Sequence, residues 1–416
     1  MTISAKPDSA LPAPLRGSET GTFTHYSIAV RLPDIGRRIL AENNFRSHIV
    51  AELENLIDGI PDAPIRPLTD TYAPDAADWR DYCLPYLEQN WLQAPWFFIE
   101  TYFYRRVLEA TQYFEEGAAT KGVDPFAYQK QQGLTKTLPA IRNLCAAVNR
   151  WLAKPAAKEQ AVAYLLHADL WGNQADLSLW PVAEPTGGPA EQGEQPNSAD
   201  AHDVFLLVDD TTAVIHHLLS LPQPVRLDVI ADNAGFELAA DLCLIDYLLR
   251  SETAVTVHLH LKSHPTFVSD ALIKDAAHTI SLMAADADEN VRLVGQSLRQ
   301  MVENGRLHLH HHLFWTSPLP MWDMPTDLRS QLAQSHLVIS KGDANYRRLL
   351  GDRHWPFTTP FAGVTAYFPA PLLALRTLKS EIIVNLAAGQ AEALTAQDPD
   401  WLTNGKWGVI QFNPQR

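Results

Sequence analysis

The spacing of hydrophobic and polar positions changes once along this chain of 416 residues, close to its middle. Before residue 182, apolar residues recur at the three- and four-residue intervals of a helix, and strand-like runs are scarce. We therefore predict a mainly α-helical domain at residues 23–181, preceded by a flexible, proline-rich arm at residues 1–22. Its helices are expected over residues 33–53, over 95–113 with a broad aromatic face and, as at least two helices, over 138–166.

Short apolar runs alternate with helical patterns after residue 202. This alternation is typical of an α/β fold, here an α/β/α sandwich on a mostly parallel, doubly wound sheet. We assign residues 203–416 to such a domain. The stretch 182–202, rich in Pro, Gly and Glu, predicts a flexible loop between the two domains. The strands are expected at residues 204–208, 225–231, 255–261, 337–340, 382–386 and 409–412.

Composition and charge exclude several classes of partner. The formal net charge of −15, from 33 Lys and Arg against 48 Asp and Glu, argues against nucleic acid and against anionic membrane surfaces. No apolar run approaches the roughly 18 residues of a membrane span, and residues 1–20 lack the apolar core of a signal peptide. Three cysteines far apart suit a reducing compartment, so we expect a cytoplasmic protein. The sequence does not specify an oligomeric state.

The segment that follows the apolar run 225–231 carries the most informative chemistry. It reads Asp232-Asn233-Ala234-Gly235-Phe236-Glu237, and a helical pattern begins directly after it. Polar groups at the carboxyl end of such a strand lie where α/β folds bind their ligands. A carboxylate and a carboxamide oxygen suit a hard divalent cation, and the free N–H groups of the next helix favour an anion. The same residues also suit a helix cap and a turn.

A second carboxylate follows the next predicted strand. Asp270 ends the segment Phe267-Val268-Ser269-Asp270, which comes a short loop after the run 255–261. In a parallel sheet it would emerge at the same edge as Asp232, giving two carboxylates and an amide oxygen around one cation. The alternative is that Asp270 caps the helix that follows it.

Two groups of cations lie beside later predicted strands. Lys341 follows the run 337–340, where cations and a glycine suit phosphate recognition, and Asp343 and Asn345 are available for sugar hydroxyls. Arg376 and Lys379 lie three apart, could share a helix face and could clamp a phosphate. The simpler alternatives are a basic, solvated helix start for the first group and a surface cation pair with Glu381 for the second.

Two other features have an ordinary structural explanation. His308, His310, His311 and His312 form a histidine tract, but the leucines around them predict a half-buried strand rather than a metal site. The pair Asp209-Asp210 ends the strand predicted at 204–208, and we interpret it as a helix cap at the rim of the site rather than as a ligand.

These segments and a few others form a series of motifs in a fixed order along the chain. The motifs are ETYFYRR from Glu100, WGNQADLS from Trp171, DNAGFEL at 232–238, FVSD at 267–270, KGDANYRRL at 341–349, the Arg-Thr-x-Lys signature at 376–379 and a final strand at 408–412. Together they resemble the DUF89 family of metal-dependent damage-control phosphatases, specifically its ARMT1-like subfamily. The resemblance runs from about residue 22 to the C-terminus. The chain departs from the commoner family pattern at Ala344, where leucine is usual, and at Ala271, where a β-branched residue is usual.

The resemblance implies a helical N-terminal domain packed on the α/β/α domain. It implies Mn²⁺, with Co²⁺, Ni²⁺ or Mg²⁺ as substitutes, held by Asp232, Asn233 and Asp270. It also implies a small-molecule sugar phosphate as substrate, such as fructose 1-phosphate or fructose 6-phosphate. The expected substrate-binding residues are Asp232, Asn233, Glu237, Asp343, Ala344, Asn345, Tyr346, Arg347, Arg376, Lys379, Glu100, Arg105 and Asn173.

The leading hypothesis is metal-dependent hydrolysis of a sugar phosphomonoester as metabolite damage control. Asp232, Asp270 and Lys341 are the expected catalytic residues. A carboxylate would orient or deprotonate water, while Lys341, Arg347 and Lys379 neutralise charge on the phosphoryl oxygens. Two alternatives stay open: S-adenosylmethionine-dependent carboxyl methyl transfer to protein glutamates, for which no glycine-rich methyltransferase loop is found, and a non-catalytic sugar-phosphate sensor.

Overall fold

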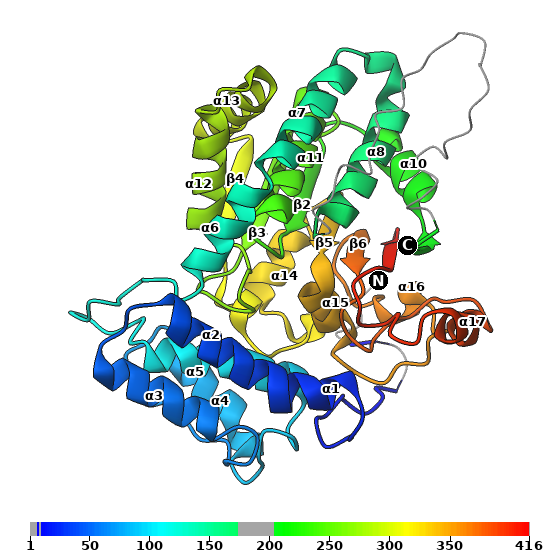
Figure 1. Cartoon of the computed structure of the whole chain (residues 1–416). Coiled ribbons are helices and arrows are strands. Elements are labelled where there is room, and N and C mark those ends of the chain that lie inside the picture. Colours follow the sequence, from blue (N-terminus) through cyan, green and yellow to red (C-terminus); the bar gives the residue numbers. More distant parts are fainter. Residues whose placement is uncertain (1–5, 8–9, 174–203, 416) are drawn as a thin grey trace.

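A seven-stranded sheet forms the centre of the fold in the computed structural model, which describes residues 6–7, 10–173 and 204–415 (Figure 1). The loop predicted at residues 182–202 lies outside the described residues. The strand order is β1-β7-β6-β5-β2-β3-β4. The strands are β1 (Leu206–Asp209), β2 (Arg226–Ile230), β3 (Thr256–Leu261), β4 (Leu307–His311), β5 (Leu337–Lys341), β6 (Leu372–Thr377) and β7 (Gly408–Asn413).

The five neighbouring strands from β6 to β4 run parallel, whereas β7 is antiparallel to β6, and β1 is parallel to β7. This confirms the predicted α/β fold with a mostly parallel sheet. The carboxyl ends of β2, β3, β5 and β6 therefore meet at one edge of the sheet, which is the edge where such folds bind ligands. We call it the catalytic edge.

The carboxyl end of β1 points away from the catalytic edge, because β1 and β7 run against the other strands. Asp209 caps the next helix, since its Oδ1 accepts a hydrogen bond of 2.9 Å from the backbone N–H of Thr211. Asp210 accepts a bond of 2.8 Å from the N–H of Phe412. Asp209 thus bonds the first turn of the helix as predicted for a cap, whereas the N-cap residue Asp210 makes no side-chain capping bond, and the predicted place at the rim of the site is wrong.

The strand predicted at residues 382–386 is also wrong. This stretch is buried but has no strand structure, and its backbone bonds to loops and side chains, for example from Asn385 N–H to Thr359 O at 2.8 Å. The strand between β5 and β7 is instead β6, at Leu372–Thr377. Arg376 therefore lies in a strand and Lys379 just beyond its end, and the two do not share a helix face.

Helices cover both faces of the sheet, and each face has its own hydrophobic core (Figure 1). In β5, Val338 belongs to the first core, whereas Leu337 and Ile339 belong to the second. The first core contains α2 (Leu32–Glu42), α3 (Ser47–Asp58), α4 (Ala76–Cys83), α5 (Trp96–Ala110), α14 (Thr326–Leu332), α15 (Gly342–Leu350), α16 (Phe361–Val364) and α17 (Gln390–Gln397), with α1 (Phe23–Tyr26) and a π-helical turn (Ser27–Arg31) before them. The second contains α6 (Ala127–Lys136), α7 (Leu138–Leu152), α8 (Lys158–Leu170), α10 (Thr211–Ser220), α11 (Phe236–Arg250), α12 (Ile273–Ala284) and α13 (Glu289–Glu303).

The N-terminal half is helical as predicted, with two differences of detail. The helix expected over residues 33–53 is divided into α2 and α3. Residues 10–22, placed in the predicted arm, pack on the protein, where buried Leu15 accepts a hydrogen bond of 2.9 Å from the N–H of Trp96. No helix within the described ranges has both the length and the apolar composition needed to cross a bilayer.

The histidine tract forms β4 beside β3, as the flanking leucines predicted. His308 and His310 lie opposite His258 and His260, and the rings of these four residues stack on one face of the sheet. His258 Nδ1 lies 2.8 Å from His310 Nε2. Within the described part of the chain, no three His, Cys, Asp or Glu side chains are arranged to hold a metal.

This histidine cluster should make the stability of the protein depend on pH. Burial, reinforced by the charge of Arg226 on His258 and by the other histidines on His310, lowers the pKa of His258 and His310 to about 4. The unfolded chain takes up these protons near pH 6.5 and the folded chain only near pH 4, so stability is lost as pH falls through this interval. Because both rings are half exposed, we expect a loss of about 1 kcal/mol for each.

The measurement is urea unfolding between pH 7 and pH 4. In a His258→Asn, His310→Asn double variant, the decline in unfolding free energy over this interval should become shallower. His216→Gln, at an exposed position on α10, is the matched control and should keep the wild-type slope. An unchanged slope in the double variant would refute this origin of the pH dependence.

Candidate active site

Two loops at the catalytic edge bring the predicted metal ligands together. Asp232 and Asn233 follow β2, and the segment ending in Asp270 comes after β3. The loops pair across an antiparallel bridge between Asn233 and Asp270. The N–H of Ala271 donates to Asp232 O at 2.7 Å, and that of Ala234 donates to Ser269 O at 2.7 Å. The side chains of Asp232, Asn233 and Asp270 therefore belong to one site.

The carboxylates of this site are buried and crowded. Asp232 is 4% exposed and Asp270 is 1% exposed. Burial and the charges of Asp270 and Glu237 raise the pKa of Asp232 well above its ordinary value, and burial also raises that of Asp270. Within the described residues, Asp232 Oδ1 has no hydrogen-bond partner. Negative charge is thus concentrated here with an unused oxygen, which a cation would neutralise.

The donors present fit a hard divalent cation. Two carboxylates and an amide oxygen are the ligands that such ions prefer. Among the described residues, no third acidic, imidazole or thiol side chain is placed to complete such a set. The amide oxygen of Asn233 would therefore be the third ligand. The Nδ2 of Asn233 donates to Asp232 Oδ2 at 3.1 Å and to Glu237 Oε2 at 2.8 Å. These bonds fix the amide and leave its oxygen facing Ser269 Oγ at 2.5 Å.

Gly342 allows α15 to begin directly against Asp232. Its φ of +78° is in the region that favours glycine, and a Cβ there would lie 1.9 Å from Asp232 Oδ2. The first turns of α11 and α15 therefore both lie at the catalytic edge, with free N–H groups and positive dipole ends that favour an anion beside the carboxylates.

Lys262 is a site residue that the sequence did not single out. It follows β3 and is 3% exposed. Its Nζ lies 3.2 Å from Asp270 Oδ2 and donates to Asn345 Oδ1 at 3.2 Å. Asn345, predicted to bind sugar hydroxyls, also donates to Ala231 O at 3.0 Å and Lys341 O at 2.9 Å. It therefore ties α15 to the ends of β2 and β5.

Lys341 forms its ion pairs with Asp169 and Asp241 and not with the expected metal ligands Asp232 and Asp270. Its Nζ lies 2.6 Å from Asp169 Oδ1 and 3.1 Å from Asp241 Oδ1, between α8 and α11. Burial alone would lower the pKa of Lys341, but Asp169, Asp241 and Glu237 raise it above its ordinary value. The lysine is therefore charged and enclosed on the second-core side of the sheet, so its role as a catalytic residue stays a prediction without geometric support.

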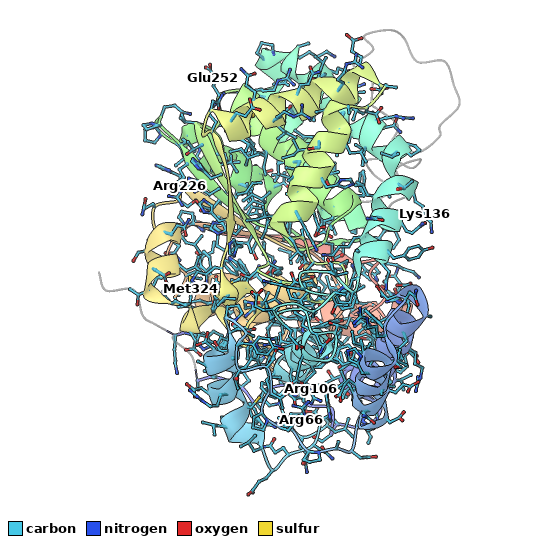
Figure 2. All side chains as sticks on the ribbon, turned by 90° about the vertical axis from the view of Figure 1, so that its left-hand side faces the viewer. Arg66, Arg106, Lys136, Arg226, Glu252 and Met324 are labelled. Carbon is cyan, nitrogen blue, oxygen red and sulfur yellow. The ribbon has the colours of Figure 1, made fainter. Side chains whose placement is uncertain are left out.

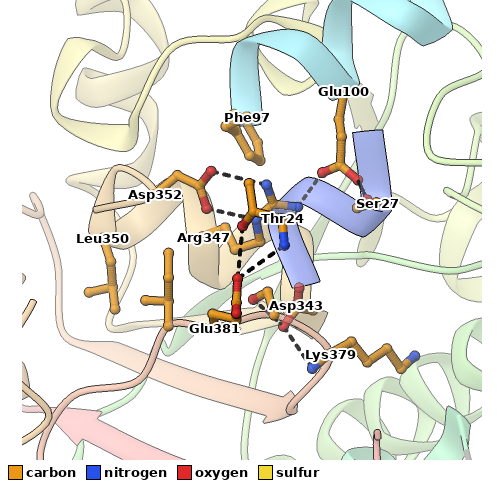
Figure 3. Close-up of polar contacts among 12 residues, drawn as sticks. Thr24, Ser27, Phe97, Glu100, Asp343, Arg347, Leu350, Asp352, Lys379 and Glu381 are labelled. Carbon is orange, nitrogen blue, oxygen red and sulfur yellow. Dashed lines mark hydrogen bonds and ion pairs between the residues drawn. The ribbon is translucent and has the colours of Figure 1, made fainter. Parts of the chain in front are cut away.

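Asp343 organises the loop that carries the Arg-Thr-x-Lys signature (Figure 3). Its Oδ1 accepts bonds from Arg376 Nε at 2.8 Å, Lys379 N at 3.2 Å and Ser380 Oγ at 3.0 Å. Arg376 is buried, stacks over the ring of Tyr346 at 4.3 Å and donates further to the carbonyl oxygen of Ser380. Arg376 and Tyr346 are thus occupied in holding this loop.

Lys379 differs from these neighbours because its side chain is unpaired within the described residues. Figure 3 shows it extending away from Asp343. Burial raises the pKa of both Asp232 and Glu237, and the positive charge of Lys379 opposes this rise at both carboxyl groups. A half-buried ammonium near the carboxylates, with no described partner of its own, is a suitable ligand for a phosphate group.

The N-terminal helices reach this region through Glu100 on α5. Glu100 forms an ion pair with Arg347, which also binds Asp352 with Nε to Oδ1 at 2.8 Å (Figure 3). The guanidinium of Arg347 stacks on the ring of Trp96 at 3.6 Å. Glu381, next to the Arg-Thr-x-Lys loop, accepts bonds from the N–H groups of Phe23 and Thr24 at 3.0 and 3.1 Å. The first helix is therefore anchored to the loop that presents Lys379.

The remaining predicted residues lie in different surroundings. Arg105 is fully buried among the N-terminal helices, where it pairs with Asp70 and Asp75, each at 2.8 Å. Ala344 is partly exposed in the first turn of α15. Asn173 lies in a short 3-10 helix after α8, and its side chain is outside what the structure describes. The site therefore combines Asp232, Asn233, Glu237, Asp270 and Lys379 with the unpredicted Lys262.

Comparisons with known proteins agree with the resemblance seen in the motifs. The model of the damage-control phosphatase ARMT1-like domain matches residues 27–394. Damage-control phosphatase ARMT1 of Mus musculus is 34% identical to this chain over 445 residues, covering 97% of this chain and 98% of that protein. The protein of the same name from Danio rerio is 33% identical over 443 residues, covering 97% of each. A crystal structure of a DUF89 family protein from Pyrococcus horikoshii aligns with a TM-score of 0.46 and 13% identity, covering 93% of this chain and 98% of that chain. Because the domain model spans most of the sequence and relatives above 30% identity match it over nearly their full length, this chain belongs to the damage-control phosphatase ARMT1-like family.

Proposed function

We propose that this protein is a metal-dependent phosphatase that hydrolyses sugar phosphomonoesters, such as fructose 1-phosphate or fructose 6-phosphate, as metabolite damage control. The observation that carries the proposal is the pair of buried carboxylates, Asp232 and Asp270, near the ammonium of Lys379, which has no partner among the described residues. One end of such a site suits a cation and the other suits a phosphate. The name of the relatives, damage-control phosphatase, supports the same activity.

Asp232, Asn233 and Asp270 would hold the metal, with Mn²⁺ as the expected ion and Co²⁺, Ni²⁺ or Mg²⁺ as substitutes. A divalent cation in this position supplies Lewis acidity toward a phosphoryl oxygen and lowers the pKa of bound water. Asp232 Oδ1, which has no hydrogen-bond partner among the described residues, is available to accept a proton or a hydrogen bond from the attacking water. Asp270 is the other candidate for this task.

The cations of the site would bind and stabilise the phosphate. Lys379 would contact the phosphoryl oxygens, where negative charge develops during the reaction. Lys262 would orient Asp270 through its 3.2 Å ion pair and oppose the rise in the pKa of Asp270 that burial causes. Asp343 would position Lys379 through its bond to the lysine backbone at 3.2 Å.

The test is release of inorganic phosphate from a panel of sugar phosphates, with Mn²⁺ and with EDTA. Release that requires the metal and favours ketose or pentose phosphates would support the proposal. Tight substrate binding with no phosphate release would favour the sensor. Saturable micromolar binding of S-adenosylmethionine in calorimetry, again with no phosphate release, would favour methyl transfer.

Replacement of Lys379 with methionine should weaken phosphate recognition without unfolding the protein. A charged hydrogen bond to a phosphate contributes about 1.5–3 kcal/mol, so kcat/KM should fall roughly 10- to 100-fold. The thermal midpoint should change little, because the ammonium has no described partner to lose. Lys154→Met, at an exposed position between α7 and α8, should keep wild-type kinetics. Wild-type kcat/KM in the Lys379 variant would count against its contact with the phosphate.

A further inference from the structure

A cavity lies at the end of α15 that is opposite to the catalytic edge. It has a volume of about 570 Å³ and opens between the segment near Arg16, the start of α5, the loop around Trp322 and the last turn of α15. A cavity of this size accommodates a molecule as large as a nucleotide. We call it the arginine cavity, after Arg16, Arg348 and Arg353 in its lining.

Arg348 is buried in the wall of this cavity and forms no ion pair with a described residue. It is 2% exposed, and the described acceptors of its guanidinium are all neutral, namely Trp315 O at 3.2 Å, Leu319 O at 2.5 Å and Ser317 Oγ at 3.4 Å. No described carboxylate lies within ion-pair distance of it. Its neighbour Arg347, by contrast, is paired with two carboxylates. A buried charge left unpaired in this way is costly, and an anion in the cavity would compensate it.

Arg353 and Arg16 add two further guanidinium groups to the same wall. The Nε of Arg353 is buried and has no hydrogen-bond partner among the described residues, while its Nη1 donates to Pro12 O at 2.5 Å. Arg16 donates to Gln93 O. Neither arginine forms an ion pair with a described residue. The three arginines therefore bring positive charge to the lining of one cavity, and Arg353 adds a buried donor that has no partner among the described residues.

The carboxylates around the cavity do not balance this charge. Asp352 is engaged by Arg347 at 2.8 Å, and Asp81 lies 3.7 Å from Arg80 at an exposed position. Asp323 is the carboxylate that remains in the described lining, against three arginines. The cavity therefore carries net positive charge in a protein whose overall charge is −15.

Aromatic side chains form much of the rest of the wall, namely Tyr82, Tyr86, Phe97, Phe98 and Trp322. Planar rings of a ligand stack on such surfaces, and guanidinium groups bind phosphate oxygens in pairs. We propose that the arginine cavity binds an organic phosphate that carries an aromatic ring and has the size of a nucleoside monophosphate. This ligand differs from the sugar phosphate of the proposed function, and the two sites lie at opposite ends of α15.

Calorimetric titration of the full chain with AMP, adenosine and inorganic phosphate tests the proposal. The titrations use the Lys379→Met variant in EDTA, so that neither hydrolysis nor phosphate binding by Lys379 contributes. We expect one AMP per chain with a Kd below about 1 mM, and binding of adenosine and of inorganic phosphate at least about tenfold weaker. Equal affinity for AMP and adenosine, or for AMP and inorganic phosphate, would overturn the proposed ligand class, and no AMP binding would overturn the site.

Substitutions then locate the bound AMP. Arg353→Gln and Arg16→Gln, at positions that are not fully buried, should each weaken AMP binding at least about tenfold while the thermal midpoint stays close to that of the parent. Arg348→Gln should abolish binding, and circular dichroism would show whether it remains folded. Arg37→Gln, an exposed arginine on α2, should have no effect. Undiminished AMP affinity in both the Arg353 and Arg16 variants would refute the assignment to this cavity.

Discussion

Replacing Asp232 with asparagine is expected to abolish metal-dependent phosphate release while leaving the fold intact. Changes to residues that merely orient metal ligands already cost about 10- to 100-fold, so loss of a ligand itself should lower kcat/KM by more than about 100-fold. The fold should tolerate the change because the wild-type carboxylate is crowded by Asp270 and Glu237. An amide of the same shape removes that repulsion. The measurements are Mn²⁺-dependent phosphate release and thermal unfolding in EDTA.

A matched control for this variant is Asp210→Asn. Asp210 also follows a strand, and its carboxylate accepts a hydrogen bond from Phe412 N, but it lies away from the catalytic edge. It should keep wild-type turnover. Metal titration adds a readout that does not depend on catalysis, since Asp232→Asn should lose the thermal stabilisation that Mn²⁺ gives to the wild type. Wild-type turnover or wild-type stabilisation by Mn²⁺ in the Asp232 variant would exclude this aspartate as a metal ligand.

The sheet could be predicted from the sequence wherever a strand is an apolar run bounded by turns, as for β2, β3 and β5. The failure at residues 382–386 shows the limit of this signal. Hydrophobic pattern reports burial, and Ile382, Ile383 and Val384 are as buried as any strand residue. Whether such a run pairs as a strand depends on which backbone lies beside it in the folded protein. The position between β5 and β7 is occupied by β6.

The site was predictable in its acidic half because its residues follow parallel strands directly. Asp232 and Asp270 needed only the rule that parallel strands end at one edge. Predicting where the lysines lie also requires knowing to which face of the sheet each strand residue points. In β3, Val257, Leu259 and Leu261 point into the second core, so Lys262 points to the opposite face, where Asp270 is.

The same alternation places Lys341 on the other side of the sheet. Leu337 and Ile339 of β5 point into the second core, so Lys341 points there too, toward Asp169 and Asp241. The alternation of side chains along β5 could be predicted from the sequence, but the face of the sheet that carries the site could not. That face is determined by the N-terminal helices of the first core. Contacts between residues so far apart in the sequence leave no local sequence pattern.

Replacing Lys341 with methionine should therefore destabilise the protein rather than selectively impair catalysis. The change removes the cation that neutralises two buried carboxylates, Asp169 and Asp241, and removal of one partner from a buried ion pair costs about 3–5 kcal/mol. The loss should appear as a lower midpoint of urea unfolding. Lys274→Met, a half-exposed lysine 3.7 Å from Asp124, should change the free energy of unfolding by less than about 1 kcal/mol.

The destabilisation should also depend on pH in a direction that identifies its cause. Burial already raises the pKa of Asp169 and Asp241 in the presence of the lysine, and its loss would raise both further. A folded-state pKa above the unfolded value means that the folded chain binds more protons, so stability falls as pH rises through the folded pKa. The deficit of Lys341→Met should thus be smaller at pH 5 than at pH 8, and Asp241→Asn in the same chain should restore part of it at pH 8. A stable Lys341→Met protein with severely reduced kcat would contradict this explanation and return the lysine to the catalytic site.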